Sequence, residues 1–108
     1  MENKFYITTT LPYVNADPHI GFAKEIIEAD VLSRYHRAKG DEVFFNTGTD
    51  EHGLKIFRKA KELGIDVQKY CDKKAAEFDK LKKALDLSYD NFIRTTDEKH
   101  LKAVMLHD

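Results

Sequence analysis

A histidine and a glycine at the predicted start of a helix are the first residues whose types suggest chemistry. The stretch "DPHIGF", from Asp17 to Phe22, places His19 and Gly21 directly after an Asp-Pro pair. A helix start offers unpaired backbone N–H groups and a partial positive charge, so it attracts anions. His19 would add a hydrogen-bond donor, and Gly21 would let a phosphate or a planar ring approach the backbone closely. The alternative is that both residues only serve packing, because three-residue matches arise easily by chance.

A second polar stretch, "GTDEHG" (Gly48 to Gly53), offers a carboxylate and another histidine. Asp50 could hold the ammonium group of a ligand, although local evidence favours a helix N-cap. A role for His52 as ligand, base or surface residue stays open. Tyr13, in the loop before His19, either covers an apolar ligand group or packs under its own loop. These side chains include no close-spaced pair on one helix face, so the sequence predicts no protein-bound metal.

The elements that must position these stretches begin with a strand, a helix and a second strand. "KFYITTT" (Lys4 to Thr10) and "DEVFFNT" (Asp41 to Thr47) are rich in β-branched and aromatic residues, which predicts strands. Between them the pattern predicts a helix from about His19 to Lys39. Asp17 is its expected N-cap, with Pro18 in the first helical position and Gly40 as the left-handed C-cap. The predicted inward stripe of this helix is Ile20, Ala23, Ile27, Val31, Tyr35 and Ala38.

The rest of the chain predicts three more helices and one more strand. A short helix ends at Gly64, a longer one is capped by Asp66, and a last one is capped by Thr96. "YDNFIRTT" predicts a short third strand. The expected inward residues are Leu54, Phe57, Ala60 and Leu63 in the first of these helices, and Val67, Tyr70, Cys71, Phe78, Leu81 and Leu85 in the second.

Alternating strands and helices predict an α/β fold with a Rossmann-like parallel sheet and flanking helices. Ligands of such sheets bind beyond the carboxyl ends of the strands. The loop from 11 to 22 and the loop from 48 to 53 both fall at this edge, so pattern and topology select the same site.

Length and composition restrict the class of protein. The chain has 108 residues, 42% of them hydrophobic, which fits one domain with a modest core. Lys and Arg number 18 and Asp and Glu 19, which gives a formal net charge of -1. This balance does not predict nucleic-acid binding across the whole chain. Cys71 is the only cysteine, and no stretch has the length of a signal peptide or a membrane span. These features predict a cytoplasmic protein without a membrane partner.

Three separated motifs together resemble the start of a methionyl-tRNA synthetase, a class I aminoacyl-tRNA synthetase with the "HIGH" signature. They are "TTTLPYVNADPHIGF", "ADVLSRYHRAKGDEVFFNTGTDEHG" and "YDNFIRTTDEKH", and they occur in the family's order. The resemblance implies that methionine is activated with ATP and Mg²⁺ to methionyl-adenylate and then transferred to tRNA(Met). It covers nearly the whole chain and implies the N-terminal half of the family's nucleotide-binding fold.

The resemblance also implies roles for particular residues. His19 would contact the ATP phosphates and stabilise the transition state, and Gly21 would lie against the adenine. The backbone of Leu11 and the side chains of Tyr13 and Asp50 would hold methionine, with Asp50 meeting the α-amino group. Losing one such preorganised donor typically costs ~10²–10³ in rate, so His19→Ala is expected to be severe.

The chain departs from the family in two respects. Phe22 stands at the last position of the ATP-binding signature, where the family normally has histidine. We expect Phe22 to pack while His19 and the helix amides hold phosphate. Residues 1–108 lack a "KMSKS"-type loop, a zinc-binding insertion and an anticodon-binding domain. We therefore expect the N-terminal part of a catalytic domain, weakly active or inactive by itself, whose partner is the remaining half of that domain.

Two other functions fit the sequence less well. One is a small nucleotidyltransferase that shares the "HxGH" phosphate site, against which Leu11, Tyr13 and "GTDEHG" argue. The other is a non-catalytic, partner-binding half of a split synthetase, which Phe22 and the chain length favour.

Overall fold

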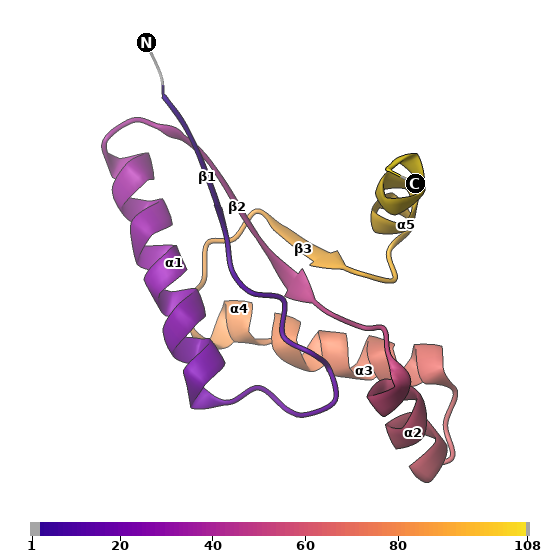
Figure 1. The fold of residues 1–108 in the computed structure, drawn as a ribbon. Coiled ribbons are helices and arrows are strands. Elements are labelled where there is room, and N and C mark those ends of the chain that lie inside the picture. Colours follow the sequence, from indigo (N-terminus) through magenta and orange to yellow (C-terminus); the bar gives the residue numbers. More distant parts are fainter. Residues whose placement is uncertain (1–2, 108) are drawn as a thin grey trace.

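Three parallel strands form the sheet of this protein, as the strand–helix–strand pattern predicts. The computed structural model describes residues 3–107. Its strands are β1 (Lys4–Thr8), β2 (Glu42–Thr49) and β3 (Asn91–Arg94), hydrogen-bonded in the order β1-β2-β3 with both pairs parallel (Figure 1). β2 runs two residues further than predicted, so the glycine and threonine of "GTDEHG" belong to the strand rather than to the loop.

The helices of the two crossovers pack on the same face of this sheet. They are α1 (Ile20–Ala38) between β1 and β2, and α2 (Leu54–Glu62), α3 (Val67–Asp79) and the short α4 (Leu81–Ala84) between β2 and β3 (Figure 1). A further helix, α5 (Glu98–Leu106), follows β3. The predicted end of the last helix at Asp108 lies outside the described residues. Phe22 of α1 meets Phe78 of α3 edge to face, with ring centroids 5.5 Å apart. The Cα atoms span 53 × 35 × 17 Å, a thickness that fits one helix layer on one sheet.

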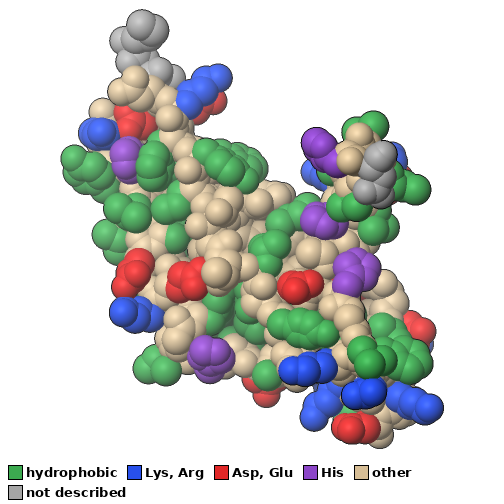
Figure 2. Space-filling model, in the orientation of Figure 1, with side chains coloured by type: hydrophobic (Ala, Val, Ile, Leu, Met, Phe, Trp, Pro, Cys, Tyr) green, Lys and Arg blue, Asp and Glu red, His purple; other side chains and the backbone are tan. Residues whose placement is uncertain are grey.

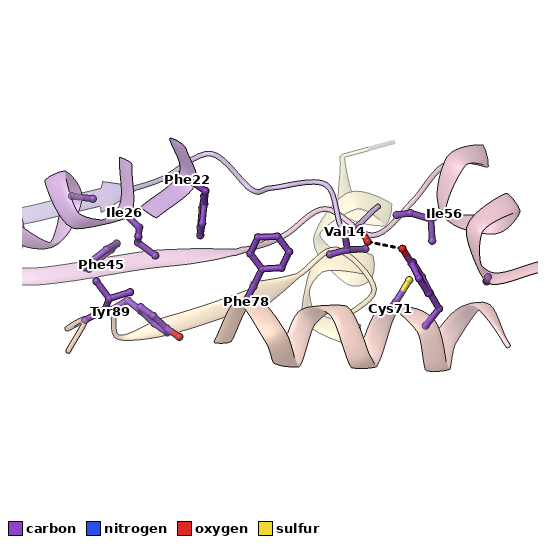
Figure 3. Packing of buried hydrophobic residues seen from close by; sticks show 12 residues of the cluster. Val14, Phe22, Ile26, Phe45, Ile56, Cys71, Phe78 and Tyr89 are labelled. Carbon is purple, nitrogen blue, oxygen red and sulfur yellow. Dashed lines mark hydrogen bonds between the residues drawn. The ribbon is translucent and has the colours of Figure 1, made fainter. Parts of the chain in front are cut away.

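The core lies between α1, α3 and the helix side of β2. Phe45 of β2 is fully buried and meets Tyr89 edge to face, with centroids 6.1 Å apart. Figure 3 shows Phe22 and Ile26 of α1, Phe45 of β2 and Phe78 of α3 converging in this core. The inward residues predicted for the helix capped by Asp66 are confirmed, because Tyr70, Cys71 and Phe78 are buried and Val67, Leu81 and Leu85 pack against the same cluster. The structure divides this predicted helix into α3 and α4.

The buried face of α1 differs from the predicted stripe. Phe22, Ile26, Ala29 and Ser33 are buried, together with the carboxylate of Asp30. The polar pair faces inward because each has a partner there: the Ser33 hydroxyl donates to the Ala29 carbonyl, and Asp30 binds Ser88 before β3. The helix is thereby rotated, and five members of the predicted stripe are exposed: Ile20, Ile27, Val31, Tyr35 and Ala38.

Helix boundaries correct two predicted caps and confirm two others. His19, not Asp17, is the N-cap of α1, and Asp17 instead binds Lys74. Asp97, not Thr96, precedes α5, because the Thr96 hydroxyl donates to Glu51. The left-handed glycine after α1 is confirmed, since Gly40 has φ +96°. Asp66 caps α3 as predicted, accepting hydrogen bonds from the amides of Gln68 and Lys69.

α2 is held to the core by a narrow contact. Only Ile56 and Ala60 among its described residues are buried, whereas Leu54, Phe57 and Leu63, predicted to face inward, are more than half exposed. Its basic side chains project around this helix into solvent at the lower right of Figure 2. These are Lys55, Arg58, Lys59 and Lys61.

Candidate functional site

A pocket of about 370 Å³ lies where the loop after β1 meets the start of α1. Of the six predicted site residues, Tyr13, His19, Gly21 and Phe22 line it, whereas Leu11 and Asp50 do not. The remaining wall is Thr10, Pro12, Asn15, Ala16, Asp17, Glu25 and Phe78. The pocket opens at the carboxyl end of β1, which is the edge that the topology predicts for a ligand.

The His19 ring folds back over the first turn of α1. Its Nδ1 accepts a hydrogen bond from the Gly21 amide at 3.0 Å, which satisfies one of the unpaired N–H groups of the helix start. An accepting Nδ1 carries no proton, so the neutral ring holds its proton on Nε2. The ring therefore presents an N–H donor at the pocket, beside the helix amides.

Gly21 is required by this arrangement of the histidine. A Cβ atom at position 21 would lie 2.8 Å from Cε1 and 3.1 Å from Nδ1 of His19. Any larger residue would push the imidazole away from the helix start. The sequence predicts space for a ligand at Gly21, and the structure adds that the His19 ring needs the same space.

Phe22 contributes its ring to both the core and the pocket wall. The side chain is buried and its ring meets Phe78 edge to face. In Figure 3 the two rings point toward each other from α1 and α3. The expectation that Phe22 packs is confirmed by this burial.

α3 supports the loop that leads to His19 at two points. The Tyr70 hydroxyl donates to the Val14 carbonyl at 3.1 Å, drawn as the dashed line in Figure 3. Tyr70 is fully buried, and burial raises the pKa of its hydroxyl. Lys74 Nζ donates to Asp17 Oδ1 at 2.6 Å, and this bond lowers the pKa of the exposed Asp17 carboxyl.

Asp50 joins the same loop through its backbone. Its amide donates to the Pro12 carbonyl at 2.9 Å, and its carbonyl accepts from the Val14 amide at 3.1 Å. These bonds bracket Tyr13, which pairs with Asp50 as an isolated parallel bridge. Asp50 does not cap α2, whose N-cap is Gly53, so the alternative role predicted for Asp50 is wrong. The tyrosine and the carboxylate-bearing residue are thus held side by side.

Gly53 leaves room for the Tyr13 side chain. Its φ of +126° is a conformation that favours glycine, and a Cβ atom there would lie 2.4 Å from the Tyr13 hydroxyl. A second hollow, of about 450 Å³, opens on this side between Tyr13, Asn15, Leu54 and Lys55. Tyr13 and Asn15 therefore separate two adjacent hollows.

Sequence reasoning missed two carboxylates near the site. Glu25 of α1 lines the pocket and accepts from the amide and hydroxyl of Thr10, at 2.6 and 2.8 Å. Glu51 is buried beside Asp50 and binds Arg94. The sequence did offer a signal for Glu51: successive side chains of an extended segment point to opposite sides, so if Asp50 faces the ligand, Glu51 is expected to face the core. His52 lies outside the pocket, with Nε2 3.0 Å from the Thr95 carbonyl oxygen.

Among residues 3–107, no group of three or more His, Cys, Asp or Glu side chains is arranged to hold a metal ion. In that part of the chain, no helix is long and apolar enough to cross a membrane. Cys71 is a buried free thiol whose pKa is raised by burial.

A parallel sheet with a polar helix start at its carboxyl edge defines a nucleotide-binding type of α/β domain. Comparison with known families identifies its kind: the family described as tRNA synthetases class I (M) matches residues 5–106. The chain therefore belongs to the class I tRNA synthetases of this methionine group. The resemblance in the three sequence motifs is confirmed, and the family match favours it over a small nucleotidyltransferase.

Individual relatives agree with this family. The chain is 54% identical over 101 residues to the methionine–tRNA ligase of Thermotoga maritima, covering 94% of this chain and 16% of that protein. It is 48% identical to the Rickettsia bellii methionine–tRNA ligase, covering 98% of this chain and 21% of the other. Among solved structures, Mycobacterium tuberculosis methionyl-tRNA synthetase in complex with methionyl-adenylate matches with a TM-score of 0.90 at 40% identity, over 94% of this chain and 20% of that one. The chain thus spans roughly a sixth to a fifth of the length of these relatives.

Proposed function

We propose that the chain is the N-terminal catalytic portion of a methionine–tRNA ligase. In the proposed reaction, a carboxylate oxygen of methionine attacks the α-phosphorus of ATP. A bond forms between that oxygen and phosphorus, the bond to the β-phosphate oxygen breaks, and pyrophosphate leaves. The methionyl group then passes from the adenylate to tRNA(Met). The observation that carries the proposal is the pocket that joins His19 and Tyr13 in a fold matching an adenylate-bound synthetase.

In this proposal the α1 start handles ATP. The Nε2–H of His19 donates to a phosphate oxygen, and the neighbouring helix amides add partial positive charge. Gly21 lies against the adenine, and Phe22 forms the wall behind it. A donor held in place before the reaction stabilises developing charge without reorganisation, which is the contribution expected of His19.

The proposed methionine site is formed by the backbone of Leu11 and the side chains of Tyr13 and Asp50. The bridge between Tyr13 and Asp50 supports this grouping, because it fixes the backbones of the tyrosine and the aspartate next to each other. The carboxylate would pair with the α-ammonium group of methionine, and the ring would cover its apolar side chain.

The remaining participants follow from the same proposal. Mg²⁺ enters as part of the substrate, bound to the phosphates of ATP. tRNA(Met) is the acceptor, the remaining half of the catalytic domain completes the site, and the proposed location is the cytoplasm.

The test is methionine-dependent exchange of pyrophosphate into ATP. We define the fusion enzyme as the Thermotoga maritima ligase in which this chain replaces the matching 101-residue segment. We expect exchange with methionine and background exchange with leucine or isoleucine. A folded fusion enzyme that shows no exchange with methionine, while the parent enzyme does, would contradict the proposal.

The same assay separates a catalytic chain from a non-catalytic partner-binding one. Binding of methionine and ATP to the fusion enzyme is measured by calorimetry beside exchange. A catalytic chain gives binding and exchange together, whereas a partner-binding half gives a folded protein with neither.

A further inference from the structure

The buried carboxylate of Glu51 has no role in the proposed chemistry, although it adjoins Asp50. Its side chain is 0% exposed, so an unpaired charge there would be costly. Three side chains donate to it. Arg94 approaches with Nε 2.8 Å from Oε2 and Nη2 2.6 Å from Oε1, and the hydroxyls of Thr49 and Thr96 lie 2.6 and 3.1 Å from its oxygens. The carboxylate is therefore fully engaged inside the protein.

Arg94 extends this contact to a third element. Its Nη2 also lies 2.7 Å from Asp72 Oδ1 on α3. The guanidinium thus ties the end of β3 to Glu51, the second residue after β2, and to α3, which supports the loop that leads to His19. A planar fork can bind a carboxylate through two parallel bonds, which a lysine ammonium group cannot reproduce.

The backbone on both sides of Asp50 is fixed by these contacts. On one side, Asp50 itself is bonded to Pro12 and Val14. On the other, the Glu51 amide donates to the Thr95 hydroxyl at 2.8 Å, and the Cys71 thiol donates to the Glu51 carbonyl at 3.7 Å. Neighbouring side chains of an extended backbone point to opposite sides. Glu51 is buried and Asp50, extended in its bridge to Tyr13, is only part-buried, so we infer that anchoring the Glu51 side chain inward directs Asp50 outward.

We propose that Arg94 is a positioning residue for the methionine site: it anchors Glu51 and so orients Asp50 beside Tyr13. This inference rests on the proposed function for the identity of the ligand. The clamp itself, defined by Glu51, Arg94 and Asp72, rests on the hydrogen bonds alone.

The clamp predicts a selective defect in Arg94→Lys. The positive charge stays, but the fork that holds Glu51 is lost, so Asp50 gains freedom while His19 and Gly21 keep their contacts. A displacement of about 1 Å can cost ~10² in rate, so we expect the KM for methionine in the fusion enzyme to rise about tenfold or more. The KM for ATP should stay within about twofold, because the α1 start is held separately.

Arg37→Lys is the matched control. Arg37 also binds a carboxylate and a serine, with Nη2 2.9 Å from Asp90 Oδ2 and Nη1 2.7 Å from the Ser88 hydroxyl. Its side chain has a similar exposure, 32% against 23% for Arg94. Arg37 is in the last turn of α1, and its partners precede β3 at the opposite end of that strand from the site, so neither KM should change.

Thr96→Val provides a milder variant should Arg94→Lys not fold. It removes one donor to Glu51 at nearly constant volume. We expect a smaller rise in the KM for methionine, again without a matching rise for ATP.

Amide hydrogen exchange of the 108-residue chain tests the clamp without any catalysis. In Arg94→Lys we expect faster exchange at the Asp50 and Val14 amides than in wild type or Arg37→Lys. Unchanged exchange would overturn the clamp, and an equal rise in both KM values would overturn the selective role. If wild-type fusion enzyme failed to use methionine, the function and the ligand of this site would both be rejected, whereas faster exchange at Asp50 would still establish the clamp.

Discussion

The His19 imidazole combines a structural bond with a free donor at the start of α1. Its Nδ1 caps the helix through the Gly21 amide, and its Nε2–H is left for a ligand. Asparagine is a strong N-cap but does not reach as far as an imidazole. His19→Asn should therefore keep the free energy of unfolding within about 0.5 kcal/mol of wild type, whereas loss of the cap in His19→Ala costs about 1 kcal/mol.

Both His19 variants should lose activity alike, because neither carries the Nε2 donor. We expect methionine-dependent exchange in the fusion enzyme to fall by ~10²–10³. His107→Ala, in the exposed last residues of the described chain, is the control and should exchange normally. Wild-type exchange in His19→Asn would show that His19 serves the helix alone.

The phenylalanine at the end of the signature predicts a second residue-scale result. Phe22 is buried against Phe78, so Phe22→His would place a polar ring in the core. We expect a loss of about 1–3 kcal/mol in the free energy of unfolding and no gain in exchange rate. Phe22→Leu, which keeps the position apolar, separates lost aromatic packing from buried polarity. A large gain in exchange with histidine would mean that the native site lacks a needed donor.

At the residue scale, local sequence identified the groups at the pocket but not those that hold them. His19, Gly21 and Tyr13 could be predicted because they stand in short polar stretches at strand ends. The Glu51–Arg94 pair could not, because its partners are 43 residues apart and nothing local indicates that they meet.

At the scale of elements, one buried carboxylate links α1 to the segment before β3. Asp30 accepts from the Ser88 amide at 2.7 Å, the Ser88 hydroxyl at 2.6 Å and Arg34 Nε at 2.7 Å. Burial by itself would raise the pKa of Asp30, but the bonds from Ser88 and Arg34 outweigh it, so the pKa lies below its ordinary value of 3.8. The stabilisation is therefore present above pH 3.8 and is lost as the pH falls through the lower pKa of the folded state.

Asp30→Asn should weaken this link and its dependence on pH. We expect a loss of about 1–3 kcal/mol at pH 7 and a shallower further loss on acidification below about pH 4. Urea unfolding of the chain at a series of pH values measures both. Asp86→Asn is the control, since Asp86 approaches the same Arg34 but is fully exposed. An acid profile of Asp30→Asn identical to wild type would exclude Asp30 as a source of the acid sensitivity.

The order and type of the elements could be predicted, whereas the orientation of α1 could not. Strand and helix periodicity, Gly40 and Asp66 mark most boundaries. The face of α1 is hidden in the sequence because Asp30 and Ser33 are polar yet buried, while Val31 and Tyr35 are apolar yet exposed. The burial of Asp30 is compensated by Ser88, 58 residues away, so a local pattern selects the wrong stripe.

At the scale of the whole molecule, helices cover one face of a parallel sheet and leave the other open. Both crossover helices pack on the side of Phe45 (Figure 1). On the opposite side, Tyr6 and Phe44 stack with centroids 5.7 Å apart and are 62% and 46% exposed. All-parallel sheets normally have both faces covered, so we expect this open face to promote association between copies of the chain.

Replacing the stacked pair tests this consequence of the open face. In Tyr6→Thr/Phe44→Thr the strands keep β-branched residues, so we expect the free energy of unfolding to fall by about 1 kcal/mol or less. Self-association, measured by sedimentation velocity over a concentration series, should decrease because the exposed apolar area is smaller. Tyr35→Gln removes an equally exposed aromatic ring from α1 instead of the sheet, and it should associate like wild type. An equal decrease in both variants would assign association to apolar exposure in general, and no decrease in the double variant would place it elsewhere on the molecule.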